Sequence, residues 1–206
     1  MKRISCEVVA VGTELLLGQI VDTNSSWIGE QLALNGIDSF FQTKVGDNPS
    51  RIKSVLRQAL DRSDVVIVCG GLGPTQDDLT RDMIAEVMGV ELRMDEVLVE
   101  KISAMFSGRN RRMPENNLRQ AMVPEGAEPL PVMPGTAPGL KAPVGDKTIY
   151  AVPGVPWEMK QMVESWIIPD IRSAAGLTSI IRSKTLRTWG DSESCLLYTS
   201  PSPRDS

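Results

Sequence analysis

The chain has 206 residues, of which 41% are hydrophobic and 23% charged, a composition typical of a folded globular protein rather than a disordered one. Its formal net charge of -4 excludes a global basic field that would attract nucleic acid. Histidine is absent, which excludes Ser-His and Cys-His nucleophilic schemes, histidine general bases and histidine-rich zinc sites.

The three cysteines, Cys6, Cys69 and Cys195, form no CxxC pair, and an odd number is poor material for a disulfide framework. Cys6 and Cys69 lie in apolar runs and are expected to be buried in a reducing compartment. No signal peptide is evident, and no apolar run approaches the roughly 18 residues that a membrane span requires. We therefore expect a cytoplasmic protein without a membrane partner.

The first half of the chain alternates between strand and helix patterns. Apolar runs predict strands, and apolar residues recurring every three or four positions predict helices. The expected strands cover residues 4–11, 40–45 and 65–69, and the expected helices cover residues 24–34, 49–60 and 79–88. This order predicts a three-layer α/β/α fold with an open, mostly parallel sheet.

The second half is less regular. A helix is expected over residues 95–106, short strands and turns over residues 124–145, a strand over 148–152 and a helix over 157–168. The basic residues 109–112 suit either a solvated loop or an arm that closes over phosphates. A strand over residues 180–186 is expected to open a second unit.

The strongest chemical signal is the segment GGLGPTQDDLT at residues 70–80, between an expected buried strand and an expected helix. Glycines allow a tight turn and close approach to a ligand, and free amides at a helix start favour an anion such as phosphate. The spacing matches neither a Walker A loop nor GxGxxG. A plain turn capped by Asp77 is the alternative. Asp77 and Asp78 beside an anion-favouring loop indicate a divalent cation.

Three further loops are expected at the same edge of a parallel sheet, each with one acidic residue. They carry Glu14, Asp47 and Glu158, respectively. Taken singly, each acid equally suits a turn former or a helix cap. Together with Asp78 they predict an acidic, oxygen-rich pocket.

Five ordered motifs then identify a resemblance: GTELLLGQIVDTN, GGLGPTQDDLTRDMIA, NLRQAMVP, GTAPG and PGVPWEMK. Together they resemble the N-terminal domain of CinA-type competence/damage-inducible proteins, within the wider family similar to molybdopterin-binding MoaB/Mog proteins. The resemblance predicts a domain over residues 1–175 and the start of a truncated connecting domain over 176–194. Residues 195–206 match no pattern and are expected to be a non-native or disordered tail. The C-terminal deamidase domain of such proteins, which acts on nicotinamide mononucleotide, has no counterpart here.

The resemblance implies a MoaB/Mog-like fold and a glycine loop that binds the phosphate of a nucleotide or pterin. It places catalytic carboxylates at Asp78 and Asp47, and it implies metal-dependent hydrolysis of the pyrophosphate in ADP-ribose-like dinucleotides. A divalent cation (Mg, Mn or Co) is expected on Asp78, Asp77 and Glu158. The expected substrate- or phosphate-binding residues are Gly12, Glu14, Asn24, Gly70, Gly71, Gly73, Pro74, Thr75, Thr136 and Gly154.

Two other functions stay open. One is a molybdopterin-binding or adenylating domain with the same loop and both aspartates, so that molybdopterin is the ligand. The other is a non-catalytic accessory domain. In each case the expected partner is a small molecule, a dinucleotide or a pterin phosphate, with no nucleic acid, and the resemblance favours a homo-oligomer.

Overall fold

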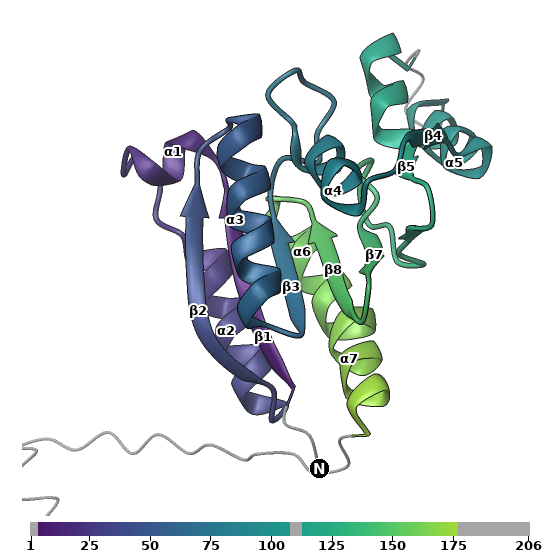
Figure 1. Ribbon diagram of the computed structural model, residues 1–206. Helices are drawn as coiled ribbons and strands as arrows, with labels where there is room; N and C mark the ends of the chain where they lie inside the picture. Colours follow the sequence, from purple (N-terminus) through teal and green to yellow (C-terminus); the bar gives the residue numbers. More distant parts are fainter. Residues whose placement is uncertain (1–3, 108–112, 177–206) are drawn as a thin grey trace, which may run out of the picture.

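The computed structural model describes residues 4–107 and 113–176 and has three layers (Figure 1). Its main sheet has six strands in the order β2-β1-β3-β8-β7-β6. Their bounds are β1 Ser5–Val11, β2 Asp38–Val45, β3 Val65–Cys69, β6 Glu128–Pro129, β7 Leu140–Val144 and β8 Lys147–Val152. The first four in this order are parallel, whereas β7 is antiparallel to both β8 and β6. The expected α/β/α architecture is confirmed.

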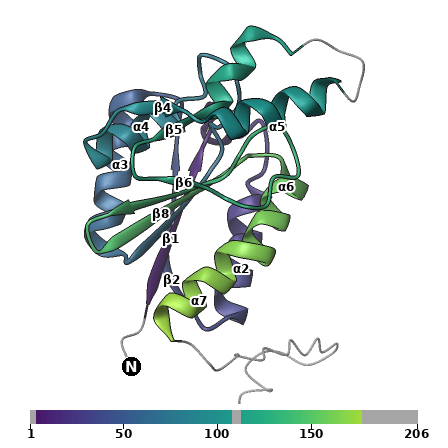
Figure 2. The same cartoon turned by 90° about the vertical axis from the view of Figure 1, so that its right-hand side faces the viewer.

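Helices cover both faces of the sheet (Figures 1 and 2). One face packs against α3 (Pro49–Arg62) and α4 (Thr80–Met88), and the other against α2 (Thr23–Leu34) and the helical segment that follows β8. Successive residues of β3 pack on opposite faces of the sheet. Val66 and Val68 belong to the first core, and Ile67 belongs to the second. The continuous apolar run of β3 is therefore buried on both sides, as a central parallel strand requires.

A small outlying unit lies between α4 and β6. It contains β4 (Leu92–Met94) and β5 (Met122–Pro124), which pair antiparallel, together with α5 (Glu96–Ser107) and the 3₁₀ helix η1 (Glu115–Ala121). Sequence patterns predicted α5 but not η1, nor the short helix α1 (Thr13–Leu16) in the loop after β1.

The last helix runs further than the pattern indicates. Residues 157–168 were expected to form a helix that stops before Pro169, but the chain continues through α6 (Pro156–Met162), a π-helical turn η2 (Val163–Ile167) and α7 (Ile168–Ala175). Proline cannot donate a backbone hydrogen bond and crowds the preceding turn. The wider π turn just before Pro169 accommodates it without ending the helix.

Several predictions lie outside the described residues: the basic segment 109–112, the strand over 180–186, most of the expected connecting domain and the tail with Cys195. Cys6 and Cys69 are buried and unpaired, as expected. None of the helices in the described part of the chain is both long and apolar enough to cross a bilayer.

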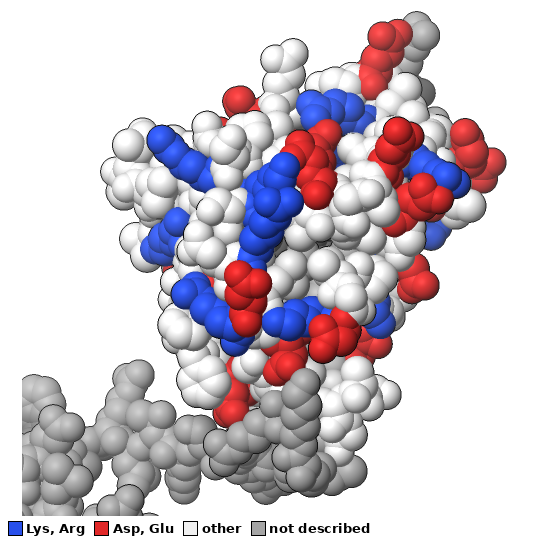
Figure 3. All heavy atoms as spheres, in the orientation of Figure 1, with Lys and Arg blue, Asp and Glu red and all other residues white. Residues whose placement is uncertain are grey.

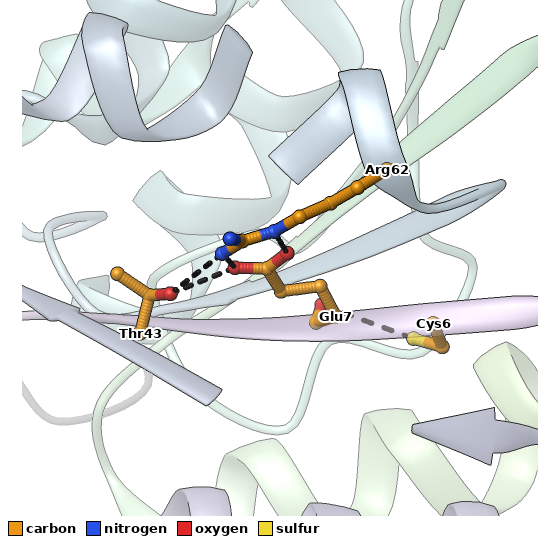
Figure 4. A network of polar contacts seen from close by, with 4 residues as sticks. All are labelled: Cys6, Glu7, Thr43 and Arg62. Atoms are coloured by element: carbon orange, nitrogen blue, oxygen red, sulfur yellow. Dashed lines mark hydrogen bonds and ion pairs between the residues drawn. The ribbon is translucent and has the colours of Figure 1, made fainter. Parts of the chain in front are cut away.

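A charged network joins β1 to the edge strand β2 and to α3 (Figure 4). Glu7 of β1 is fully buried, and its carboxylate accepts two hydrogen bonds from the Arg62 guanidinium, at 2.7 and 2.6 Å. Thr43 of β2 donates a third, at 2.7 Å. The Arg62 guanidinium also lies 4.0 Å from the centre of the Phe41 ring. β1, β2 and the end of α3 thus meet at one buried carboxylate.

Replacing Glu7 with Gln is expected to lower the free energy of unfolding by about 1–3 kcal/mol, because charge-assisted hydrogen bonds become neutral ones in a buried site. Urea unfolding followed by circular dichroism measures the change. Glu86→Gln is the matched control, since Glu86 pairs with Lys53 at the surface and its loss should cost less than about 1 kcal/mol. Equal effects of the two substitutions would contradict a special role for the buried pair.

Candidate functional site

A pocket of about 600 Å³ lies at the carboxyl end of the parallel strands. Its walls come from the loops after β1, β2, β3 and β8, which leave the sheet at the edge toward which β2 and β8 point in Figure 1. These are the four loops that the sequence predicted to converge. The outlying unit and the segment before β7 complete the walls with Gln120, Thr136 and Ala137.

The loop after β3 turns sharply at two glycines. Gly70 and Gly71 have φ values of 106° and 68°, a region that side chains rarely adopt. A Cβ on Gly70 would collide with the Val11 carbonyl oxygen, and one on Gly71 with the Thr80 hydroxyl. Thr80 in turn donates to the Gly70 carbonyl at 2.8 Å. The loop can pass so close to β1 and α4 only because glycine occupies both positions.

The alternative of a plain turn capped by Asp77 is wrong. Helix α4 begins at Thr80, its N-cap residue is Leu79, and no side chain caps it. One amide at the helix start is already engaged, because the Thr80 N–H donates to the Gly71 carbonyl at 3.1 Å. The loop is longer than a simple strand-to-helix turn. A backbone hydrogen bond within the loop, rather than a side-chain cap, is formed at the start of α4.

Asp78 closes this loop on itself. Its Oδ2 accepts hydrogen bonds from the Thr75 N–H at 2.9 Å and the Thr75 hydroxyl at 2.5 Å. Asp78 lines the pocket, whereas Thr75 does not. The expected role of Thr75 as a donor to phosphate therefore requires a ligand to displace Asp78.

Asp47 forms hydrogen bonds that join the loop after β1 to the loop after β2. Its Oδ2 accepts the Thr13 N–H at 2.8 Å, and the Thr13 hydroxyl accepts the Asp47 N–H at 3.1 Å. The reciprocal pair ties the two loops together and holds the Asp47 carboxylate at the pocket wall. One Asp47 oxygen takes part in this bonding, which leaves the other for a ligand.

Three pocket carboxylates lie directly against glycine backbones. A Cβ on Gly12 would collide with the Glu14 carboxylate, one on Gly73 with that of Asp78, and one on Gly135 with that of Glu158. Burial raises the pKa of Glu158 above its ordinary range. The carboxylates are thus held close to the protein surface rather than extended into solvent.

Two arginines outside the pocket lining donate to carbonyls of the glycine loop, and the sequence analysis identified neither. Arg81 is almost completely buried and donates to the Leu72 carbonyl at 3.1 Å; Arg119 donates to the Thr75 carbonyl at 3.0 Å and pairs with Asp82 at 3.3 Å. Burial lowers the pKa of Arg81 to about 10, and its Nε has no hydrogen-bond partner among the described residues. Arg81 directly follows the glycine segment in the sequence, whereas Arg119 lies 44 residues beyond Thr75 and no local pattern places it there.

The pocket itself is strongly acidic. Its described lining includes five carboxylates and no lysine or arginine: Glu14, Asp47, Asp77, Asp78 and Glu158. On the face seen in Figure 3, by contrast, basic and acidic side chains are interspersed. A phosphate entering this pocket without a cation would meet only repulsion from charged side chains.

The carboxylate oxygens of the pocket suit a metal ion that binds together with a phosphate-containing ligand. Within the described residues, no three acidic or cysteine side chains form a ready-made metal site. Mg²⁺ and similar ions commonly use one or two carboxylates together with substrate phosphates and water. Oxygen donors shared by several loops fit that arrangement better than a resident metal held by the protein alone.

Most of the expected site residues line this one pocket. Those present are Gly12, Glu14, Asp47, Gly70, Gly71, Gly73, Pro74, Asp77, Asp78, Thr136, Gly154 and Glu158. Asn24 instead lines a smaller neighbouring cavity and donates to the Gly154 carbonyl at 2.8 Å. Gln120 was missed, although it lies in the NLRQAMVP motif, because no charge or glycine pattern marks it.

A family model and the curated relatives of this chain point to the same family. Residues 7–173 match the family model described as "Probable molybdopterin binding domain". A CinA-like protein from Frankia casuarinae is 48% identical over 195 residues, which cover 92% of this chain and 45% of the relative. A CinA-like protein from Nostoc sp. is 44% identical over 194 residues, covering 94% and 46%. The chain thus spans slightly less than half the length of these curated relatives.

Solved structures agree. The protein CinA from Thermoplasma acidophilum, described as of unknown function, is 35% identical with a TM-score of 0.71, covering 79% of this chain and 95% of that one. The tungsten cofactor synthesizing protein MoaB from Pyrococcus furiosus shares the fold at 18% identity and a TM-score of 0.56, covering 87% and 99%. The chain belongs to the molybdopterin-binding-domain family of MoaB/Mog-like fold, and its relatives there include the CinA-like proteins.

Proposed function

We propose that this domain is a metal-dependent hydrolase of the pyrophosphate bond in ADP-ribose-like dinucleotides. The observation that carries the proposal is the pocket lining, in which five carboxylates and a tight glycine loop meet without a lysine or arginine among the described residues. A pyrophosphate can be stable there only when divalent cations neutralise it. Metal dependence is therefore the first property that such an enzyme must have.

Each group has a role in this proposal. Asp78 or Asp47, or another of the carboxylates lining the pocket, would supply one or two protein oxygens to the cation, and the phosphates and water would supply the rest. A bound Mg²⁺, Mn²⁺ or Co²⁺ would neutralise developing charge on the phosphates and lower the pKa of a bound water. Glu158 lines the same pocket and is a carboxylate available to position the attacking water. Water adds to one phosphorus atom, the bridging P–O bond breaks, and AMP and ribose 5-phosphate leave.

The second candidate is a molybdopterin-binding or adenylating domain. The description of the family model favours it, and a pterin phosphate could occupy the same loop. Pterin fluorescence in the purified protein, with no release of AMP from ADP-ribose, would support this reading. The third candidate, an accessory domain, would bind a ligand without turning it over.

The decisive experiment is AMP release from ADP-ribose, measured by chromatography with Mg²⁺, Mn²⁺, Co²⁺ or EDTA. Release is expected only with metal, and Asp78→Asn is expected to lower kcat by a factor of about 10² or more, since a neutral amide is a poor metal ligand. Asp61→Asn is the matched control, because Asp61 is exposed on α3 and outside the pocket. No release with any metal from a folded protein would reject the hydrolase.

A second variant tests whether the position of Asp78 matters as much as its charge. Gly73→Ala would displace the Asp78 carboxylate, whose Oδ2 accepts both Thr75 hydrogen bonds, and Gly73 is not among the positive-φ glycines. The loss of those bonds should lower the free energy of unfolding by about 1–2 kcal/mol, whereas kcat/KM should fall about 10- to 100-fold because the carboxylate moves.

Gly29→Ala provides the comparison. Its new Cβ would likewise meet a polar side-chain end, the Gln42 amide, but on α2 and away from the pocket. Wild-type activity in Gly73→Ala would show that the Gly73–Asp78 contact has no catalytic role.

A further inference from the structure

One wall of the pocket comes from the outlying unit and carries a glutamine, Gln120 of η1. Gln120 is almost completely buried, with 2% of its surface exposed. Among the described lining residues, it is the only one whose side chain carries an N–H group, because the other polar side chains are five carboxylates and the hydroxyl of Thr136. The mechanism proposed above assigns Gln120 no role.

Asn117 fixes which end of the Gln120 amide can meet a ligand. Asn117 Nδ2 donates to Gln120 Oε1 at 2.8 Å, and both residues are buried. Gln120 Nε2 has no hydrogen-bond partner in the described chain, yet it is not among the three side-chain polar atoms there that are both buried and unpaired. An unpaired atom outside that set retains accessible surface, so Nε2 faces the pocket that Gln120 lines.

The neighbours of Gln120 hold it in place beside the glycine loop. Arg119 donates to the Thr75 carbonyl at 3.0 Å, which ties η1 to the loop, and Ala121 is fully buried in the first core. The Ala121 carbonyl also accepts the Asp95 N–H at 2.9 Å. Because the chain is anchored on both sides and the side-chain carbonyl is already bonded, the amide needs little reorganisation to meet a ligand.

A neutral N–H donor has a specific value in this acidic pocket. A lysine or arginine at this position would pair with the carboxylates and compete with a metal ion for them, whereas an amide carries no charge. The Nε2 group donates hydrogen bonds and does not accept them, so it favours an oxygen acceptor and does not bind a cation. A metal-bound phosphate brings such oxygens into the pocket.

We propose that Gln120 is a phosphate-binding residue, whose Nε2 donates a hydrogen bond to an oxygen of the phosphate bound at the glycine loop. Asn117 is its positioning residue, because its bond to Oε1 sets the direction of the donor. The inference rests on the proposed function in one respect, the binding of phosphate together with a metal ion in the pocket. It also explains why the outlying unit reaches the site.

Two-dimensional ¹H–¹⁵N NMR of the wild-type protein tests the donor. The Gln120 side-chain signals are identified as the pair missing from Gln120→Met, and inorganic phosphate is then added in the presence of Mg²⁺. A Gln120 amide proton is expected to move downfield, because a short, charge-assisted hydrogen bond deshields the donated proton. The side-chain amide of Gln58, which is exposed on α3 and donates to Ser54, should not move.

Calorimetry with the same probe measures the size of the effect. Gln120→Met removes the donor without adding charge, and it is expected to weaken phosphate binding in the presence of Mg²⁺ about 10-fold, the value of one hydrogen bond to a charged group. Gln120→Glu keeps an acceptor for Asn117 but replaces the donor with a negative charge, so it should weaken binding further. Gln58→Met is the matched control and should bind phosphate like the wild type, because Gln58 is outside the pocket.

Asn117→Asp tests the orientation of the amide. The new carboxylate accepts hydrogen bonds and cannot donate one, so the Gln120 amide is expected to turn its N–H₂ toward position 117 and away from the pocket. Added phosphate should then no longer move the Gln120 protons. A purely structural role of Asn117 would leave that movement intact and would overturn its assignment as the positioning residue.

The remaining outcomes separate this inference from the proposed function. Phosphate binding that leaves the Gln120 protons unmoved and survives in Gln120→Met would overturn the role of Gln120 and leave the phosphate site standing. An equal movement with Mg²⁺ alone would assign the signal to the metal and overturn the donor. Absence of any phosphate binding would overturn the inference as well, whereas release of AMP from ADP-ribose judges the proposed function separately.

Discussion

The parallel alignment of β1, β2, β3 and β8 is the constraint on which the site depends. Parallel strands present all their carboxyl ends at one edge, so loops that are far apart in the chain meet there. Because these strands are buried between two helical layers, their order and register cannot shift without exposing apolar side chains. The fully buried Glu7 adds to this constraint, since its bonds to Thr43 and Arg62 join β1 to its neighbours at a single point.

Within that frame, backbone geometry rather than side-chain charge shapes the loop after β3. Gly70 and Gly71 turn the chain against Val11 and Thr80 so closely that any side chain would collide. Arg81 and Arg119 donate to loop carbonyls, and neither is among the residues that line the pocket. The positive charge of Arg81 is thereby buried near the site without lining it, which is compatible with a pocket that relies on cations brought by the ligand.

Two features of this region leave polar groups without full compensation. The pocket lining carries carboxylates but no cationic side chain, and a buried oxygen nearby has no hydrogen-bond donor. Five carboxylates in one described lining repel one another, and a bound cation would relieve that repulsion. The buried Asp22 Oδ2 has no hydrogen-bond donor among the described residues and lies 3.7 Å from Lys44 Nζ. Both features occur where the loops of parallel strands meet.

The sequence by itself determined the architecture and most of the pocket. Apolar runs and helical periodicity are local signals, and the alternation of strand and helix leads to a parallel sheet whose strand ends share an edge. That reasoning was sufficient to bring Glu14, Asp47, Asp78 and Glu158 together. It failed at Pro169, where a π turn keeps the helix going.

Only the tertiary structure decided which groups are already engaged and which are not. Thr75 looked like a phosphate donor, but its N–H and hydroxyl are bonded to Asp78. Asp22 and Asn24 are near neighbours in one motif, yet Asn24 is bonded to Gly154, and Asp22 retains a buried oxygen without a donor. The physical reason is that hydrogen-bond satisfaction depends on distances between separate loops, and no local pattern of residues contains those distances.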